Sequence, residues 1–302
     1  MSAPTLAAGT TSGSARRALD QRDLDAIIGV AAADLLAWRG ARLLVTGATG
    51  FVGSWLLRTL VEANRQLSLD LELVALARRP SYLAPEVMAS ASVTPVMADV
   101  RDLGARDCGQ IGHLDAVVHL ACPSSAAAGS IDHDPHPLSA TIIDGSRAIL
   151  RLATACGRMR MLFASSGAVH GRGAGRPART PEDCAAAPLP GEPNAGYGLA
   201  KRLMEHEAYL ATSAGEADVV VARLWAFLGP LLPLDIHYAA GNFVADVLGG
   251  RAVHVKGNPA TVRSYLYPTD LVGWLLAALT RGRPGVAYNI GSDVDTTIAE
   301  LA

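Results

Sequence analysis

The amino-acid sequence predicts an α/β fold, in which a doubly wound parallel β-sheet is joined to a smaller C-terminal substrate-binding cap. Three observations predict this fold. Short apolar runs rich in β-branched residues do not alternate with polar residues, which is typical of strands covered on both faces. Stretches with helical apolar spacing lie between most of these runs. A glycine-rich turn follows the first run.

The predicted elements follow one another in a regular order. Residues 1–20 are small and polar, and we expect a disordered tail because they have little apolar surface to bury. Apolar spacing within residues 21–40 predicts a helix that lies across the following domain. The predicted strands are 42–47, 71–77, 93–98, 115–121, 159–165 and 218–224. The predicted helices between them are 52–65, 138–157 and 196–212.

The second half of the chain contains a long loop and the cap. Residues 171–196 are rich in proline, glycine and alanine, and a loop of this length in a compact domain is usually a lid or a binding loop. After Trp225 the alternation of strands and helices loosens. We therefore expect residues 41–225 and 262–290 to form the main domain. Residues 226–261 and 291–302 are expected to form the cap over the carboxyl ends of the strands.

Composition and charge limit the kinds of partner. The formal net charge is -2 and no basic stripe is present, so nucleic acid has little electrostatic reason to bind. No apolar segment reaches the roughly 20 residues that span a bilayer, and no stretch resembles a signal peptide. The 4 cysteines include no C-x-x-C pair. We expect a cytoplasmic protein with no nucleic-acid partner, no membrane partner and no metal site.

The stretch VTGATGFVGS (45–54) closes the first predicted strand and opens a helix. Its glycines, Gly47, Gly50 and Gly53, are spaced three apart. Residues without a Cβ let the backbone N–H groups at the helix start approach a diphosphate, whose charge the helix dipole favours. A purely structural turn is the alternative. The place of this turn after the first strand of an alternating chain favours dinucleotide binding.

Two further positions concern the adenosine part of a dinucleotide. The second strand ends with Arg78 and Arg79 where an acidic residue would bind the ribose hydroxyls. Guanidinium groups there suit a 2′-phosphate and favour NADP, while a solvated arginine pair is the alternative. Asp99 follows the third strand, where a carboxylate could accept a hydrogen bond from the adenine amino group. An ordinary turn aspartate fits the same position.

Tyr197 and Lys201 in GYGLAKRLME (196–205) share one helix face, because they are four residues apart. Only Lys201 and Lys256 among the 26 basic residues are lysines, which favours a chemical role for Lys201. A close ammonium stabilises a phenolate and lowers a tyrosine pKa of about 10 toward the range where the phenol exchanges protons. Ser166, in SSGAVHG (165–171), ends a predicted strand; its hydroxyl could be structural or could face a substrate.

The motifs GATGFVG, Asp99-Val100, DAVVHLA, SSGAVHG and YGLAK, in this order, resemble the extended short-chain dehydrogenases/reductases, in particular their NAD-dependent epimerase/dehydratase branch, which acts on nucleotide sugars. The resemblance covers about residues 40–300 and implies a Rossmann domain. It implies that Ser166 binds the reacting sugar oxygen, Tyr197 exchanges its proton, and Lys201 binds the nicotinamide ribose and tunes Tyr197. The NAD(P)-binding residues that it implies are Gly47, Thr49, Gly50, Phe51, Val52, Gly53, Arg78, Arg79, Asp99, Val100, Leu120, Ala121, Tyr197 and Lys201.

Two positions lack the acids that some members of this family use. In sugar 4,6-dehydratases the two residues after the active hydroxyl are typically Asp and Glu, and related decarboxylases have Glu at the second. This chain has Gly167 and Ala168, which cannot carry a proton. Dehydration and decarboxylation by those routes are therefore not expected. Epimerisation through a transient keto sugar, or reduction of a keto sugar, needs only hydride and hydroxyl-proton exchange.

Other departures affect the site. His170 replaces the usual tyrosine before Gly171, and could assist proton transfer or simply belong to a turn. Ile142 stands where the family often has an asparagine that braces the active-site helix, and Ala226 replaces another asparagine that contacts substrate. The chain also stops soon after the helix that TTIAELA begins, so part of the cap is expected to be missing or supplied differently.

The resemblance also implies a diphosphate site for the substrate. Arg263 matches the arginine that clamps the nucleotide diphosphate by charge-assisted hydrogen bonds, and Asn242 matches an asparagine that meets the same group. A surface ion pair and a helix cap are their structural alternatives. Asn289 is expected to be structural at a strand end. Homodimerisation through helices 138–157 and 196–212 is implied by the family.

The leading functional hypothesis is an NAD(P)-dependent epimerase or ketoreductase that acts on a nucleotide-linked sugar, with Tyr197 as acid/base. The arginine pair favours a reductase that uses exchangeable NADPH. A reductase of a non-sugar ketone or aldehyde is one alternative. A non-catalytic dinucleotide-sensing protein is another, although the intact Tyr-x-x-x-Lys pair argues against it.

Overall fold

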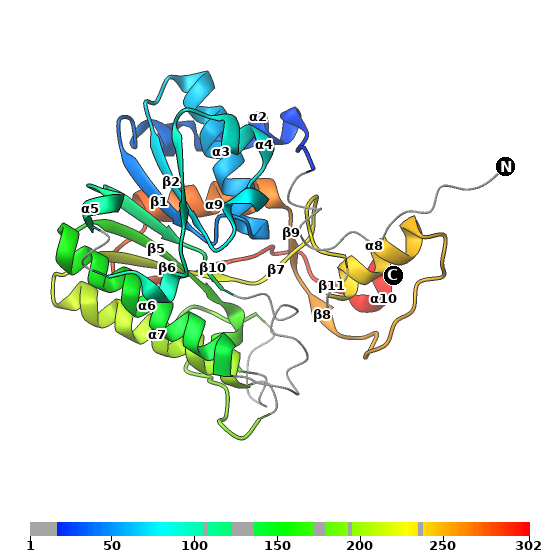
Figure 1. The fold of residues 1–302 in the computed structure, drawn as a ribbon. Helices are drawn as coiled ribbons and strands as arrows, with labels where there is room; N and C mark the ends of the chain where they lie inside the picture. The colour runs from blue at the N-terminus through cyan, green and yellow to red at the C-terminus, as the bar shows by residue number, and fades with distance from the viewer. Residues whose placement is uncertain (1–16, 105–107, 123–135, 172–178, 193–194, 235–237) are drawn as a thin grey trace.

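The computed structural model describes residues 17–104, 108–122, 136–171, 179–192, 195–234 and 238–302. Its centre is a parallel sheet of seven strands in the order β10-β6-β5-β4-β1-β2-β3 (Figure 1). The strands are β1 (Arg42–Thr46), β2 (Glu72–Ala77), β3 (Val93–Met97), β4 (Ala116–His119), β5 (Arg160–Ser166), β6 (Asp218–Leu224) and β10 (Ala287–Ile290). The chain runs outward through β2 and β3 on one side of β1, and through β4, β5, β6 and β10 on the other. In doubly wound sheets ligands bind where the strand order reverses in this way, which here is at the carboxyl ends of β1 and β4.

Helices cover both faces of the sheet, with a separate apolar core between the sheet and each helix layer (Figure 1). One layer contains α2 (Gln21–Leu36), α3 (Phe51–Leu67), α4 (Pro85–Ala89) and α9 (Pro268–Arg281). The other contains α5 (Cys108–Ile111), α6 (His136–Cys156) and α7 (Ala195–Ser213). Short 3-10 turns follow three strand ends: η1 (Pro80–Tyr82), η2 (Val100–Asp102) and η4 (Gly167–His170). The predicted doubly wound fold is confirmed.

The strand β3 differs from the expectation that every strand is covered on both faces. It lies at the edge of the sheet, and Thr94, Pro95 and Met97 are exposed. An edge strand can accommodate Pro95 because its missing N–H removes no hydrogen bond needed on the open side. The apolar run alone could not distinguish this edge strand from a central one.

The cap elements lie beyond the carboxyl end of the sheet, beside β7 and β9 (Figure 1). A parallel pair joins β7 (Ala226–Phe227) to β9 (Tyr265–Leu266), and an antiparallel pair joins β8 (Val262–Arg263) to β11 (Thr296–Thr297). The helices α8 (Ala239–Leu248) and α10 (Ile298–Leu301) belong to the same region. Arg263 lies within β8, two residues before β9. The predicted domain boundaries remain predictions.

Three further findings bear on the compositional expectations. Within the described ranges, no helix has both the length and the apolar character required to cross a membrane. The same residues contain no cluster of three His, Cys, Asp or Glu side chains that could hold a metal ion. Cys156 is disulfide-bonded, while Cys184 is a free thiol. The cysteine spacing gave no sign of a disulfide, and the cytoplasmic location stays a prediction.

Candidate active site

The backbone of the glycine turn between β1 and α3 has a conformation and close contacts that residues with side chains could not adopt. Gly47 has a φ of +66°, and a Cβ on it would lie 2.7 Å from the carbonyl of Leu120 at the end of β4. A Cβ on Gly53 would lie 2.3 Å from the Gly47 carbonyl oxygen. Gly50 caps the start of α3 without a side-chain hydrogen bond. The turn therefore brings bare backbone and the positive end of a helix dipole to the carboxyl ends of β1 and β4.

Other predicted cofactor-binding residues surround this turn. Thr49 and Val52 are half-buried, and the ring of Phe51 stacks on Phe227 with 5.3 Å between centroids. Leu120 and Ala121 follow β4 and are also half-buried. The turn, the β4 end and the first residues of α3 thus lie together.

Beneath the turn a buried polar chain joins β1, β4 and α6. The backbone N–H groups of Leu120 and Ala121 donate to Thr46 Oγ1, each at 3.2 Å, and Thr46 Oγ1 lies 2.8 Å from His119 Nδ1. Ser146 Oγ lies 3.3 Å from His119 Nε2 and donates to the Ile142 carbonyl at 2.6 Å. These partners require the neutral His119 tautomer with its proton on Nε2.

Burial and then the charge of Lys201 lower the pKa of His119 to about 3. The imidazole is 2% exposed, so a proton on Nδ1 would have to displace the Thr46 hydroxyl without access to water. His119 therefore connects the glycine turn to α6 as a neutral hydrogen-bonding group.

The residues expected at the adenosine end lie near one another. Asp99 accepts from the Arg101 side chain at 2.9 Å, and this contact lowers the pKa of Asp99; the charge of Arg78 lowers it further. Arg79 lies 5.5 Å over the Tyr82 ring, and Arg78 is exposed. Asp99 is therefore already engaged by Arg101. Val100, the next residue, is buried against α6, where a Cβ on Gly145 would lie 2.8 Å from Val100 Cγ1.

Ser166, Tyr197 and Lys201 meet where β5 ends against α7. Ser166 Oγ accepts from the Ala168 N–H at 3.2 Å and hydrogen-bonds with Tyr197. Lys201 is buried, and its Nζ donates to the Ala164 carbonyl at 2.6 Å. The helix therefore places the phenol beside the strand-end hydroxyl, and the ammonium contacts the same strand two residues earlier.

The pKa of Tyr197 shifts in the direction opposite to the one expected from Lys201. Burial raises the pKa of Tyr197 above its ordinary value and Cys122 raises it further, while the hydrogen bond with Ser166 opposes these effects. The ammonium of Lys201 contacts the Ala164 carbonyl instead. In this structure the phenol therefore keeps its proton at neutral pH.

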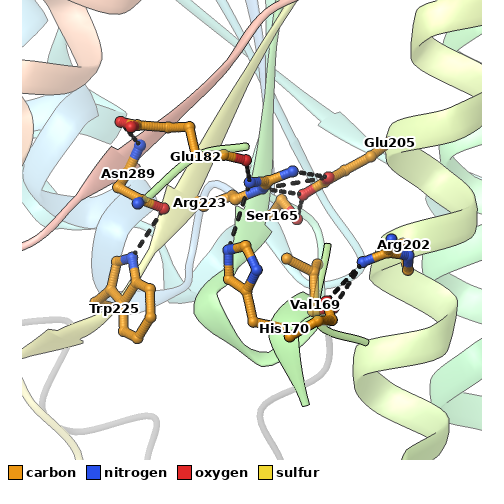
Figure 2. A network of polar contacts seen from close by, with 10 residues as sticks. Ser165, Val169, His170, Glu182, Arg202, Glu205, Arg223, Trp225 and Asn289 are labelled. Carbon is orange, nitrogen blue, oxygen red and sulfur yellow. Dashed lines mark hydrogen bonds and ion pairs between the residues drawn. The ribbon is translucent and has the colours of Figure 1, made fainter. Parts of the chain in front are cut away.

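Behind the strand end, a polar network links β5, β6 and α7 (Figure 2). Ser165 Oγ donates to Glu205 at 2.5 Å, and Glu205 forms an ion pair of 2.8 Å with Arg223. Both charged side chains are 12% exposed. Ser165 thereby joins the strand end that carries Ser166 to this ion pair, in which removal of one charge would leave the other largely buried and unpaired.

The same network holds the described part of the predicted binding loop, residues 179–192. Arg223 donates to the Glu182 carbonyl at 2.7 Å, and Asn289 Nδ2 donates to the Thr180 carbonyl at 2.8 Å. Arg202 donates to the Val169 carbonyl at 3.2 Å and to the Ala186 carbonyl at 3.1 Å. Asn289 is thus a strand residue that also anchors this loop. Residues 172–178, 193 and 194 of the same predicted loop lie outside the described residues.

The three residues that depart from the family pattern are all at least partly buried. Ile142 is buried in the core between the sheet and α6, and Ala226 is half-buried in β7. His170 is buried, and its Nε2 lies 3.4 Å from Arg223 Nη1. The His170 ring stacks on Trp225 with 6.1 Å between centroids. His170 therefore contributes to the packing of η4.

The substrate residues expected in the cap lie in separate elements. Asn242 is half-buried in α8, and Arg263 is exposed in β8, where it donates to the Val262 carbonyl at 2.8 Å. Tyr238, which caps α8, also raises the pKa of Tyr197.

Sequence reasoning missed Thr46, His119, Glu205 and Arg223. Glu205 had an available signal, because Tyr197, Lys201 and Glu205 recur every four residues and therefore share one face of α7. Arg223 was hidden inside an apolar run. Only the pairing of β5 with β6 shows that Arg223 lies beside Ser165.

Comparisons with known proteins give a consistent result. A model of the NAD dependent epimerase/dehydratase family matches residues 43–291. A UDP-glucuronic acid decarboxylase from Arabidopsis thaliana is 28% identical over 269 residues, which cover 86% of this chain and 57% of that protein. The chain therefore spans little more than half the length of this relative.

Solved structures also match. A dTDP-glucose 4,6-dehydratase double mutant from Streptomyces venezuelae, with NAD and DAU bound, is 28% identical with a TM-score of 0.72. The match covers 86% of this chain and 78% of that one. An epimerase from Methanothermobacter thermautotrophicus, at 23% identity and a TM-score of 0.77, has the same fold over 91% of this chain and 78% of its own.

Proposed function

Because this chain belongs to the NAD dependent epimerase/dehydratase family, we propose that it is an NAD(P)-dependent epimerase or ketoreductase that acts on a nucleotide-linked sugar. The observation that supports this proposal is the meeting of Ser166, Tyr197 and Lys201 at the end of β5, beside the glycine turn. Neither Gly167 nor Ala168 can carry a proton, so the reaction is one that needs only hydride and hydroxyl-proton exchange.

The glycine turn and the start of α3 would hold the dinucleotide diphosphate, and Lys201 the nicotinamide ribose. A bound nicotinamide supplies or accepts a hydride. The bare backbone at Gly47 and Gly53 and the uncapped start of α3 fit an anionic group. NAD is named in the structure of the Streptomyces relative. For this chain we favour NADP, because Arg78 is exposed after β2 and an acidic residue is missing there.

Tyr197 acts as the proton carrier. Since burial raises its pKa, the phenol is protonated at neutral pH and is ready to donate to the oxygen of a carbonyl that is being reduced. Ser166, which hydrogen-bonds with Tyr197, orients the same oxygen.

The substrate is bound from the cap side. Arg263 and Asn242 would contact the diphosphate of the nucleotide sugar, the arginine through charge-assisted hydrogen bonds. The relatives named above act on a UDP sugar and a dTDP sugar, which makes these two nucleotides the first candidates.

We also propose a homodimer through α6 and α7. Leu203, Tyr209 and Leu210 expose apolar surface on α7. Light scattering during size-exclusion chromatography that gives the mass of one chain would contradict this dimer.

The test is turnover by the protein and by its Tyr197→Phe variant. NADPH and NADH are each mixed with a 4-keto sugar nucleotide, and loss of the reduced dinucleotide is followed by absorbance; UDP-glucose and dTDP-glucose are assayed for epimer formation. We expect Tyr197→Phe to lose at least about 100-fold in kcat with an unchanged dinucleotide dissociation constant, because the phenyl ring has no proton to give.

Tyr209→Phe is the matched control, since Tyr209 lies on the same helix and is exposed. It should behave as the parent does. A Tyr197→Phe protein as fast as the parent, or a parent that turns over none of these sugars, would contradict the proposal.

A further inference from the structure

The indole of Trp225 fills the space beside Gly167. A Cβ on Gly167 would lie 2.7 Å from Trp225 Cδ2 and within 2.9 Å of two further ring atoms. The strand register explains this contact, because Ser166 of β5 is paired with Leu224 of β6, and Gly167 and Trp225 follow them. A side chain at position 167 therefore has room only if the indole moves.

Several contacts fix this indole. Its Nε1 donates to Asn289 Oδ1 at 3.2 Å, and the backbone N–H of Trp225 donates to the Ile290 carbonyl at 3.1 Å. The His170 ring stacks on it with an interplanar angle of 18°. On the β10 side, a Cβ on Gly291 would lie 3.1 Å from Trp225 Cβ. The indole is therefore a rigid part of the site, and Figure 2 shows Trp225 and His170 side by side.

The position of the indole makes it a surface that a substrate can reach. Trp225 is half-buried, so part of its side chain is accessible, and it lies at the carboxyl end of β6, beside the residue that follows Ser166. Ligands of doubly wound sheets bind outside the carboxyl ends of the strands. An aromatic face carries partial negative charge, so it attracts the weakly positive C–H groups on the apolar face of a sugar ring.

Resting on the proposed function, we propose that Trp225 is a specificity-determining residue. Its indole forms the wall of the sugar pocket beside Ser166 and stacks on the sugar ring. The same indole occupies the volume that an acidic side chain at position 167 would need. With glycine at position 167 and tryptophan at position 225, this wall has no group that can transfer a proton. It has an aromatic surface that can bind the sugar instead.

The first experiment tests the shared volume without any ligand. Thermal midpoints are measured for Gly167→Ala, Trp225→Leu and the double variant. We expect Gly167→Ala to lower the midpoint by several degrees in the parent, and by much less when Trp225 is already Leu, because the smaller side chain frees the space. Gly191→Ala is the control, since a Cβ there meets nothing within 4 Å. If the midpoint shift of the double variant equals the sum of the two single shifts, the proposal that position 167 and the indole compete for one volume is wrong.

The second experiment tests the contact with the sugar. Calorimetric dissociation constants are measured for UDP-glucose, dTDP-glucose, UDP and dTDP with the parent, Trp225→Leu and Trp274→Leu, an exposed tryptophan of α9. We expect Trp225→Leu to weaken the sugar nucleotide by about tenfold while the free nucleotide diphosphate binds unchanged, because only the sugar stacks on the indole. Trp274→Leu should change neither.

The outcomes separate this inference from the proposed function. Suppose that the parent binds a sugar nucleotide. If Trp225→Leu then weakens the binding of the sugar nucleotide and of the free nucleotide diphosphate equally, or weakens neither, the proposed sugar contact is wrong and the proposed function stands. If the parent binds none of the sugar nucleotides, the proposed function fails and the sugar contact fails with it. In that case the thermal midpoints still decide whether position 167 and the indole of Trp225 compete for one volume.

Discussion

His119 shows how single residues of this site obtain their protonation states from burial. Its ring lies between Thr46 and Ser146, and the contact with Thr46 needs a neutral imidazole because Nδ1 accepts the Thr46 hydroxyl proton. Tyr197 is affected in the same way, since burial favours its neutral phenol. Two neutral side chains therefore flank Lys201, which is buried with its ammonium on the Ala164 carbonyl.

The depressed pKa of His119 predicts a stability that depends on pH. The folded-state pKa is about 3. The unfolded chain binds the proton near pH 6.5, so this stabilisation is complete above that pH and is lost as pH falls toward 3. From about pH 7.5 to about pH 5 we expect a loss of about 2 kcal/mol in the free energy of unfolding.

His119→Gln cannot titrate, and its urea-unfolding free energy should fall less over the same interval. The quantity compared is the difference in unfolding free energy between the parent and His119→Gln at each pH, because this difference cancels the contribution of the other histidines. Equal pH dependence in both proteins would rule out His119 as the titrating group.

At the scale of elements, the site depends on close approaches between a helix and a turn. The start of α3 fits against the glycine turn because Gly53 has no side chain, and α7 fits against η4 because a Cβ on Gly198 would lie 2.4 Å from the Ala168 carbonyl oxygen. Both glycines lie in a first turn of a helix that faces the candidate site. The elements are positioned by backbone contacts, and small residues allow them.

We expect Gly53→Ala to destabilise the protein by about 1–3 kcal/mol, because its methyl group would overlap the Gly47 carbonyl. Dinucleotide binding should weaken as well, since the turn must shift. Urea unfolding and the dissociation constant of NADPH measure the two effects.

Gly273→Ala is the control within another helix, α9, where the nearest atom to an added Cβ is 3.7 Å away. It should stabilise the protein by about 0.5–1 kcal/mol, as alanine does in a helix interior. A Gly53→Ala protein that matched this control would show that the turn tolerates a side chain.

At the scale of the whole molecule, α2 completes the core on one face of the sheet. Its buried side chains, including Ile27 and Leu35, join the core that contains α3 and α9. Asp34 pairs with Arg281 of α9 at 2.8 Å, and Trp38 donates to Thr280 at 2.8 Å. The helix is thus part of the folded domain and lies away from the Ser166–Tyr197 site.

Ile27→Ala should therefore lower the free energy of unfolding by about 2–4 kcal/mol while leaving the NADPH dissociation constant unchanged, because the cavity forms in the core and not in the site. Val30→Ala on the same helix is the control; Val30 is 78% exposed, and its truncation should change stability by less than about 0.5 kcal/mol. A loss of NADPH affinity in Ile27→Ala would show that α2 is coupled to the site.

The sequence by itself determined the doubly wound fold, the glycine turn and the Tyr197–Lys201 pair. These features depend on local periodicity and on spacings within one turn or one helix, which the order of residues records directly. The apolar runs and helical stretches gave the strand and helix positions for the same reason.

Only the tertiary structure decided which distant residues share an environment. The Glu205–Arg223 pair, the chain through His119 and the contact of Trp225 with Gly167 each join separate elements through strand order and register. The burial that raises the pKa of Tyr197 is also a property of the packed molecule. Desolvation and close contact depend on where the whole chain folds, so residue spacing alone could not give them.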